Sequence, residues 1–497
     1  MRLRVDAEDR PLLTRPSPSL HLPSPHLPSL RDHTDVPLRP LSAPLSIDEA
    51  LAAADANGWF HRSVCVAVLL ACFCGGMGGG VAPFLLSPVA AEADFSPWEL
   101  AWLACSQFVG MWVGSLAGGL LCDACGPGRT MASSLPPLAA GSLLPLLQAL
   151  PLSLSQLSPS SPLSLLSPFS RVSPFLLLLI GGRLCVGASI VICFQAANTY
   201  VAETCPTPLR GLYMSLLHIG IATGGLASCA LALTLPAEQW RLLLFFNAIP
   251  TLLAASPLLL FACRRESPRE VGNLHAGKRK AEVVGFVSRL RTLLHSSLRR
   301  NLGLGMVVAF MLVRNEPHTP LPSPFNFGHK GAEAWTASYI ERLNQPQLAR
   351  LSGMATMLGK VAGDLISSHR ISANLGRIRM LRWSFVACAG LLLLFVRLSS
   401  AILVTCIMFA FGLFSDIIWC NIYMLLAELF PTSIRSSAFG IVLCIGRSGG
   451  VFSSALGGLV PDMKALFCLF AASFACGGLM VGLLPDDTSR LPLPDTL

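Results

Sequence analysis

The sequence predicts an all-α membrane protein with twelve spanning helices in two related six-helix halves. Of its 497 residues 53% are hydrophobic and only 13% are charged, whereas charged residues make up about a quarter of a soluble domain. Long stretches carry no charge, and a spanning helix needs about 20 mainly apolar residues. One nine-residue pattern also occurs twice. Because the bilayer core offers no water to unpaired backbone groups, such a chain must form a helical bundle.

The chain before the first span is polar. Residues 1–45 are rich in proline and serine and are expected to be a disordered tail. Ser46 to Glu49 matches a helix-capping box, in which a serine and a glutamate three residues later bond each other's backbone N–H groups. This pattern predicts a short cytoplasmic helix over residues 46–58.

Apolar stretches then fill two regions, residues 59–263 and residues 301–485, before a cytoplasmic tail at 486–497. The predicted spans are 63–91, 100–122, 130–152, 174–202, 211–237, 242–263, 302–313, 348–367, 383–396, 401–427, 436–460 and 465–485. The seventh of these is too short for a full crossing.

Two segments, 151–174 and 314–331, resemble the Pro/Ser-rich tail more than connecting loops. Either both are loop insertions, or the coding sequence retains non-coding segments. We favour the second interpretation, because an interrupted span leaves backbone groups unpaired in lipid.

The repeated pattern reads A-E-x-x-P-T-x-x-R at Ala202–Arg210 and again, 225 positions later, at Ala427–Arg435. The register continues beyond it, since Gly224-Gly225 corresponds to Gly449-Gly450. Parallel repeats inside a membrane are typical of one large group of transporters. Each copy stands between two apolar runs, and its proline ends the preceding helix by removing a hydrogen-bond donor.

Residues 264–300 form a basic loop between the halves, with ten lysines and arginines against three glutamates. A nucleic-acid site would explain this charge, but a cytoplasmic loop explains it equally and fits the rest of the chain. The positive-inside rule then places both termini and both copies of the pattern in the cytoplasm. The bilayer itself is expected to be the plasma membrane or the membrane of a vesicle or organelle, and no nucleic acid is expected to bind.

The loop after the second span, Gly119–Arg129, resembles the loop at the same place in the major facilitator superfamily. Asp123 and Gly126 match the family pattern, whereas Arg129 comes two residues late. The segment Ile180–Gly187 is similar to the G-R-x-x-x-G that opens the fourth span in that family.

The resemblance covers residues 46–485 and is strongest toward the branch with sugar porters, organic ion transporters and synaptic-vesicle-related proteins. It implies a secondary active transporter that moves a small organic ion or polar metabolite by alternating access. A sugar/proton symporter or facilitator remains an alternative, as does a membrane receptor or scaffold without transport. An enzyme is remote, because the sequence shows no nucleophile–base set or phosphate loop, and paired gates argue against a channel.

Charged residues at helix ends are predicted to clamp the two halves together and to release them as the halves rock. The expected gating residues are Asp123, Arg129, Arg183, Glu203, Arg210, Glu428 and Arg435. In the fourth span, Arg183 and Glu203 are expected near opposite ends.

A substrate or ion cavity is predicted around Asp416, because a carboxylate midway through an apolar span is expensive and marks function. It would counter an organic cation or carry a proton, or it is a structural residue with a partner. Other polar residues expected to line the cavity are Asn421, Gln195, Asn198, His218, Asn247 and Arg447. Arg447 is also a candidate partner for a carboxylate such as Asp416.

No cofactor and no metal site are expected. Cys122 and Cys125 form a C-x-x-C without a second pair or a nearby histidine, and most other cysteines lie inside apolar runs. The expected partners are a small-molecule substrate, the lipid bilayer and a coupling proton or other ion, and the protein is expected to be a monomer.

Overall fold

The computed structural model describes residues 59–93, 95–149, 174–204, 207–264, 324–368, 376–398, 400–429 and 435–481. Every regular element in these ranges is a helix. The predicted tail, the short helix, nearly all of the basic loop and the C-terminal tail lie outside them.

Among the described residues of the first half there are eight α-helices and two short 3-10 helices. They are α2 (Trp59–Gly80), α3 (Ala82–Ala93), α4 (Pro97–Cys125), α5 (Pro127–Ser133), α6 (Leu135–Leu143), η1 (Leu144–Ala149), α7 (Pro174–Thr204), α8 (Thr207–Thr234), η4 (Ala237–Gln239) and α9 (Trp240–Arg264). A turn at Val81 separates α2 from α3, directly after the glycine-rich end of α2. At the start of α4, Ser96 and Glu99 form a capping box.

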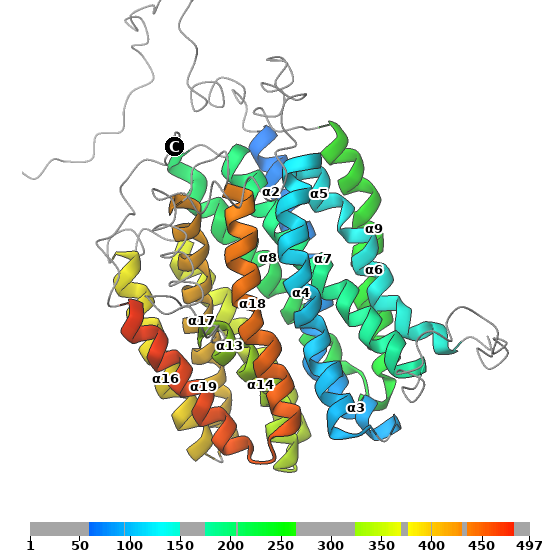
Figure 1. The fold of residues 1–497 in the computed structure, drawn as a ribbon, viewed down its shortest axis with the longest axis vertical. Coiled ribbons are helices and arrows are strands. Elements are labelled where there is room, and N and C mark those ends of the chain that lie inside the picture. Colours follow the sequence, from blue (N-terminus) through cyan, green and yellow to red (C-terminus); the bar gives the residue numbers. More distant parts are fainter. Residues whose placement is uncertain are drawn as a thin grey trace, which may run out of the picture. The chain divides into compact units, whose positions relative to one another are not determined.

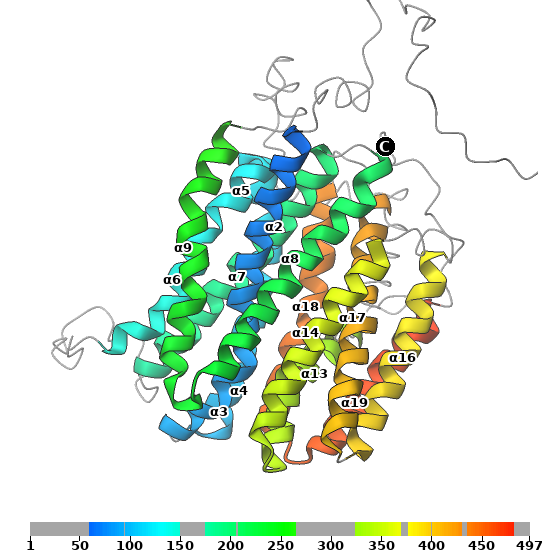
Figure 2. The same cartoon turned by 180° about the vertical axis from the view of Figure 1, so that it is seen from behind.

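The described residues of the second half form six helices. They are α13 (Pro324–Arg342), α14 (Pro346–Ser368), α16 (Arg377–Arg397), α17 (Ala401–Leu429), α18 (Arg435–Leu459) and α19 (Met463–Val481). Figures 1 and 2 show the helices of the first half, in blue to green, beside those of the second half, in yellow to red. With α2–α3 and α5–α6 each taken as one passage, the described helices make twelve passages, the number that the sequence predicts, although the seventh lies at a different place in the chain.

Within the described residues, ten helical segments are long and apolar enough to cross a membrane, and α13 and α14 are not among them. Both helices carry charged side chains that are turned into the bundle, among them Lys360 and Asp364 of α14. Their low hydropathy therefore reflects a polar interior face, because lipid would not accept these charges.

Helix α13 corrects the prediction for the seventh span. The predicted span, 302–313, lies outside the described residues, whereas Pro324–Gly331, assigned to a loop or non-coding segment, forms the start of α13. This helix packs on α14, α18 and α19, and the Trp335 indole N–H donates to the Ser454 carbonyl at 3.0 Å. The segment is thus an integral part of the bundle.

Glycines bring helix backbones into contact within each half. A Cβ on Gly110 of α4 would lie 2.1 Å from the carbonyl oxygen of Leu184 on α7. In the second half, a Cβ on Gly359 of α14 would lie 2.0 Å from the carbonyl oxygen of Phe409 on α17. Between the halves, the main contacts are those of α4 with α18 and of α8 with α14.

Candidate functional site

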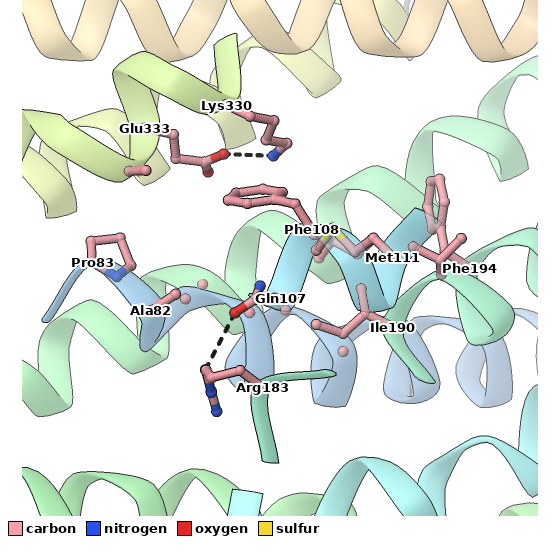
Figure 3. A pocket seen from close by; sticks show the side chains of 18 of the residues that line it. Ala82, Pro83, Gln107, Phe108, Met111, Arg183, Ile190, Phe194, Lys330 and Glu333 are labelled. Carbon is pink, nitrogen blue, oxygen red and sulfur yellow. Dashed lines mark hydrogen bonds and ion pairs between the residues drawn. The ribbon is translucent and has the colours of Figure 1, made fainter. Parts of the chain in front are cut away.

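A cavity of about 170 Å³ lies between the halves and is lined by residues of both. Helices α2, α3, α4, α7 and α8 contribute from the first half, and α13, α14, α17 and α18 from the second. Its charged lining residues are Arg183, Lys330, Glu333, Lys360, Asp416 and Arg447. In Figure 3 Lys330 and Glu333 lie on one side of the cavity and Arg183 on the other, with Phe108 and Met111 between them.

Glu333 holds two lysines at once. Its Oε2 lies 2.5 Å from the Lys330 Nζ, one turn earlier on α13, and its Oε1 lies 2.7 Å from the Lys360 Nζ on α14. All three side chains are less than a fifth exposed. Charged side chains with so little access to water are stable only when they are paired. The ion triad of Lys330, Glu333 and Lys360 therefore holds α13 against α14.

The two arginines of the cavity lack a carboxylate partner in the described part of the chain. One terminal nitrogen of Arg183 donates to the Gln107 Oε1 at 3.3 Å and to the Gly78 carbonyl at 3.4 Å. Arg447 donates to the Tyr423 hydroxyl and to the Met111 sulfur, the latter at 3.1 Å. The Nε of both arginines and the second terminal nitrogen of Arg183 have no hydrogen-bond acceptor among the described residues. Both guanidiniums therefore keep donors available in a buried place.

Aromatic rings form part of the cavity wall. Phe194 of α7 packs edge-on against Tyr423 of α17, with 4.9 Å between ring centroids, and against His218 of α8 at 5.0 Å. Trp419, one turn before Tyr423, also lines the cavity. Rings from both halves thus meet beside the Arg447 guanidinium, which donates to Tyr423, and offer flat apolar surfaces to a bound molecule.

Three of the predicted cavity residues, Asp416, His218 and Arg447, do line the cavity. The proposed pairing of Arg447 with Asp416 is replaced by the bonds of Arg447 to Tyr423 and Met111. Asp416 instead interacts electrostatically with Lys360.

The other four predicted cavity residues are buried elsewhere in the bundle. The amide groups of three asparagines donate to carbonyls one turn earlier in their own helices, at 2.7 to 2.8 Å; they are Asn198, Asn247 and Asn421. Gln195 lies where α7 meets α4 and α18, beside Gly118 and Gly440. These side chains serve helix packing, and none of them is part of the cavity lining.

The structure describes the side chains of two predicted gating residues, Arg183 and Arg129. Arg183 lies more than two turns inside α7 and lines the cavity, so it is not at a helix end. Arg129 lies partly exposed on α5. The remaining side chains lie outside the described residues: Asp123, Glu203, Arg210, Glu428 and Arg435. The helix bounds nevertheless place both copies of the repeated pattern at facing helix ends, α7 to α8 and α17 to α18.

Sequence reasoning missed Lys330, Glu333, Lys360 and Asp364. Lys330 lies in the segment 314–331, interpreted above as retained non-coding sequence or a loop insertion, and Glu333 comes two residues after the end of that segment. The sequence does contain a signal for the charges of α14, because charged residues three or four positions apart share one face of a helix. Lys360 and Asp364 show that spacing inside the predicted eighth span, where charges indicate function.

Comparisons with known proteins agree with this architecture. The family model described as Major Facilitator Superfamily matches residues 68–454. The cis,cis-muconate transport protein of Acinetobacter baylyi is 24% identical over 403 residues, covering 79% of this chain and 87% of that protein. The putative niacin/nicotinamide transporter NiaP of Bacillus subtilis is 22% identical over 422 residues, covering 84% and 94%.

Solved structures show the same fold. The proton:xylose symporter XylE bound to 6-bromo-6-deoxy-D-glucose aligns with a TM-score of 0.65 at 15% sequence identity, covering 87% of this chain and 97% of that one. The family model spans most of the two halves, and the described helices have the arrangement of that structure. The chain therefore belongs to the major facilitator superfamily.

Proposed function

We propose that this protein is a secondary active transporter that carries a small organic carboxylate through the cavity between its halves. The observation that carries this proposal is the pair of buried guanidiniums, Arg183 and Arg447, which line the cavity without a carboxylate of their own. A guanidinium matches a carboxylate with two parallel N–H donors, and the free donors of both arginines suit such a ligand.

The charge of the cavity supports an anion over a cation. Four cationic side chains line it against two carboxylates, Glu333 and Asp416. Glu333 forms ion pairs with Lys330 and Lys360, and the Asp416 carboxylate feels the electrostatic attraction of the same Lys360. An organic cation would therefore meet only the Asp416 carboxylate without an ion pair among the described lining residues, whereas an anion would meet two guanidiniums.

The relatives point the same way. Muconate is a conjugated dicarboxylate and niacin is an aromatic carboxylic acid, and both compounds appear in the names of relatives, niacin together with its uncharged amide, nicotinamide. The rings of Phe194, Trp419 and Tyr423 provide flat walls that suit an unsaturated or aromatic acid. Glucose and carnitine transporters also occur among the relatives, so sugars and cations belong in the test panel.

The positions of the two guanidiniums, one in each half, suggest how binding is coupled to alternating access. Arg183 belongs to the first half and Arg447 to the second, so an anion bound between them draws the halves together. At one end of the bundle the halves already touch, since the Ser87 hydroxyl of α3 donates to the Glu341 carboxylate of α13. The Arg350 guanidinium of α14 also donates to the Leu235 carbonyl at 3.0 Å. We place the repeated patterns and both termini at the cytoplasmic end, because of the basic connections there, and assign Asp416 as the candidate site for a coupling proton.

Uptake into proteoliposomes tests the proposal. Purified protein is reconstituted and supplied with labelled nicotinate, muconate or benzoate, with and without an imposed proton gradient. Nicotinamide, a sugar and a quaternary ammonium compound serve as uncharged and cationic controls. Saturable uptake of a carboxylate that exceeds uptake of its amide is expected. Preferred uptake of the cation or the sugar would contradict the anion assignment, and binding without flux would indicate a receptor.

A further inference from the structure

Three donor side chains of different chemistry meet beside the cavity: His218 of α8, Asp364 of α14 and Cys420 of α17. Their nitrogen, oxygen and sulfur atoms all lie within 4.8 Å of one another. The Cys420 thiol donates to the Asp364 Oδ1 at 3.0 Å, and its sulfur lies 3.3 Å from the His218 Nδ1. Asp364 and Cys420 are completely buried, and His218 alone of the three lines the cavity.

The spacing of these atoms suits a transition-metal ion. Zinc binds sulfur at about 2.3 Å and nitrogen or oxygen at about 2.0–2.2 Å in a tetrahedron, which puts neighbouring donors about 3.5 Å apart. The two measured separations are within a few tenths of an ångström of that value. The close contacts join the His218 Nδ1 and the Asp364 Oδ1 to the Cys420 sulfur, while the His218 Nε2 and the Asp364 Oδ2 have no partner among the described residues.

The charges around the cluster favour a cation. The charged groups that act on the three ligands are Asp364 itself, Asp416 and Lys360, which leaves one net negative charge at the cluster. When a divalent ion binds, the Sγ–H bond of Cys420 breaks, its proton leaves to water, and the thiolate coordinates the metal. The released proton adds one negative charge and the ion adds two positive charges, so the cluster becomes neutral.

We propose that His218, Asp364 and Cys420 form a binding site for a divalent transition-metal ion such as Zn²⁺, reached from the cavity past His218. The ligands come from both halves, since α8 belongs to the first half and α14 and α17 to the second. A bound ion therefore ties the halves together and stops alternating access. Zn²⁺ is expected to be an inhibitor of transport whatever the substrate is.

Metal binding to the purified full-length chain tests the site without any substrate. After equilibration with Zn²⁺ and removal of free metal, the wild-type protein is expected to retain one more ion per chain than Cys420→Ser. With Co²⁺ the wild type is expected to show a thiolate-to-cobalt charge-transfer band that Cys420→Ser lacks. Loss of the thiolate ligand is expected to weaken binding by more than about 100-fold, the upper range for changes to outer partners of metal ligands.

Cys388→Ser is the matched control, because Cys388 is equally buried, lies on α16 and belongs to no donor cluster within the described helices. It is expected to keep both the ion and the band. His218→Gln provides a second test if Cys420→Ser fails to elute as a folded species in gel filtration. Equal zinc content in the wild type and both ligand variants would overturn the proposal.

Transport provides the second readout. The ratio of uptake with and without Zn²⁺ is expected to fall about tenfold for the wild type and for Cys388→Ser, at a concentration about ten times the Kd. The same ratio is expected to stay near one for Cys420→Ser. Equal inhibition of the wild type, Cys388→Ser and Cys420→Ser would show that zinc acts at another site. It would refute the proposal that a bound ion ties the two halves together.

Discussion

Lys360 of α14 and Glu333 of α13 form a buried ion pair, with 2.7 Å between the Nζ and the Oε1, in the wall of the cavity. Lys330 occupies the other oxygen of the same carboxylate, as Figure 3 shows. One carboxylate thus compensates two ammonium groups on neighbouring helices. Ion pairs therefore hold α13 to α14, the seventh and eighth passages. Helices that face lipid would instead be held together by apolar packing.

Glu333→Gln is expected to destabilise the protein by about 3 kcal/mol, because breaking a buried pair leaves uncompensated charges in the interior. The measurement is thermal or denaturant unfolding in detergent. Glu92→Gln is the control, since Glu92 forms an ion pair with Arg241 at 2.6 Å but both side chains are at least a third exposed. An exposed pair contributes at most about 1 kcal/mol. Equal effects of the two substitutions would contradict the role assigned to the triad.

Arg183→Gln is expected to raise the KM for a carboxylate substrate by at least about 30-fold, which corresponds to 2 kcal/mol of lost charge-assisted binding. Arg183→Lys keeps the charge but loses the planar pair of donors, so it is expected to fall between the wild type and Arg183→Gln. Initial rates of uptake into proteoliposomes measure both. Arg382→Gln, an exposed change on α16, is expected to leave the KM unchanged. An unaltered KM in Arg183→Gln would remove Arg183 from the substrate site.

Gly359→Ala is expected to destabilise the second half by about 1–3 kcal/mol, because the added methyl group would lie 2.0 Å from the Phe409 carbonyl oxygen. Gly390→Ala is the matched control, since a methyl group there meets nothing within 4 Å. That substitution is expected to be neutral or to stabilise α16 by up to about 1 kcal/mol. Melting temperatures of the two variants in the same detergent decide the comparison.

Glu203→Gln and Glu428→Gln are expected to lower the maximal rate of uptake while leaving the KM near that of the wild type. Their positions in the last turns of α7 and α17 favour a role in the conformational step, away from the cavity. Combined, they are expected to have less than the product of the single effects, because both act on the same closure. Glu238→Gln, on the exposed η4, serves as the control. A selective rise in the KM would instead assign these residues to binding.

The sequence was sufficient to predict the helical class, the two halves and the ends of the helices that carry the repeated pattern. It failed at α13, because hydropathy treats every span as if it faced lipid. Asn326 and His329 on this helix are buried inside the bundle, beside the ion triad. The failure therefore has a physical cause, since the polar face of α13 is turned toward the other helices.

The composition of the cavity was also only partly predictable. Asp416, His218 and Arg447 could be found as polar residues in apolar runs, but Asn198 and Asn247 carry the same signal and only bond their own helices. Which side chains converge depends on how α8, α14 and α17 pack across the halves. Cys420 illustrates this, because it is 202 positions from His218 and 56 positions from Asp364.

The backbone contacts at Gly110 and Gly359 have a consequence for how such a protein evolves. These glycines hold α4 to α7 and α14 to α17, and neither of them touches the cavity. The residues that bring the helix backbones together at these two contacts are thus different from those that line the cavity. If the proposed function holds, substitutions at Arg183 and Arg447 would change the cargo while the glycine contacts within each half stay as they are.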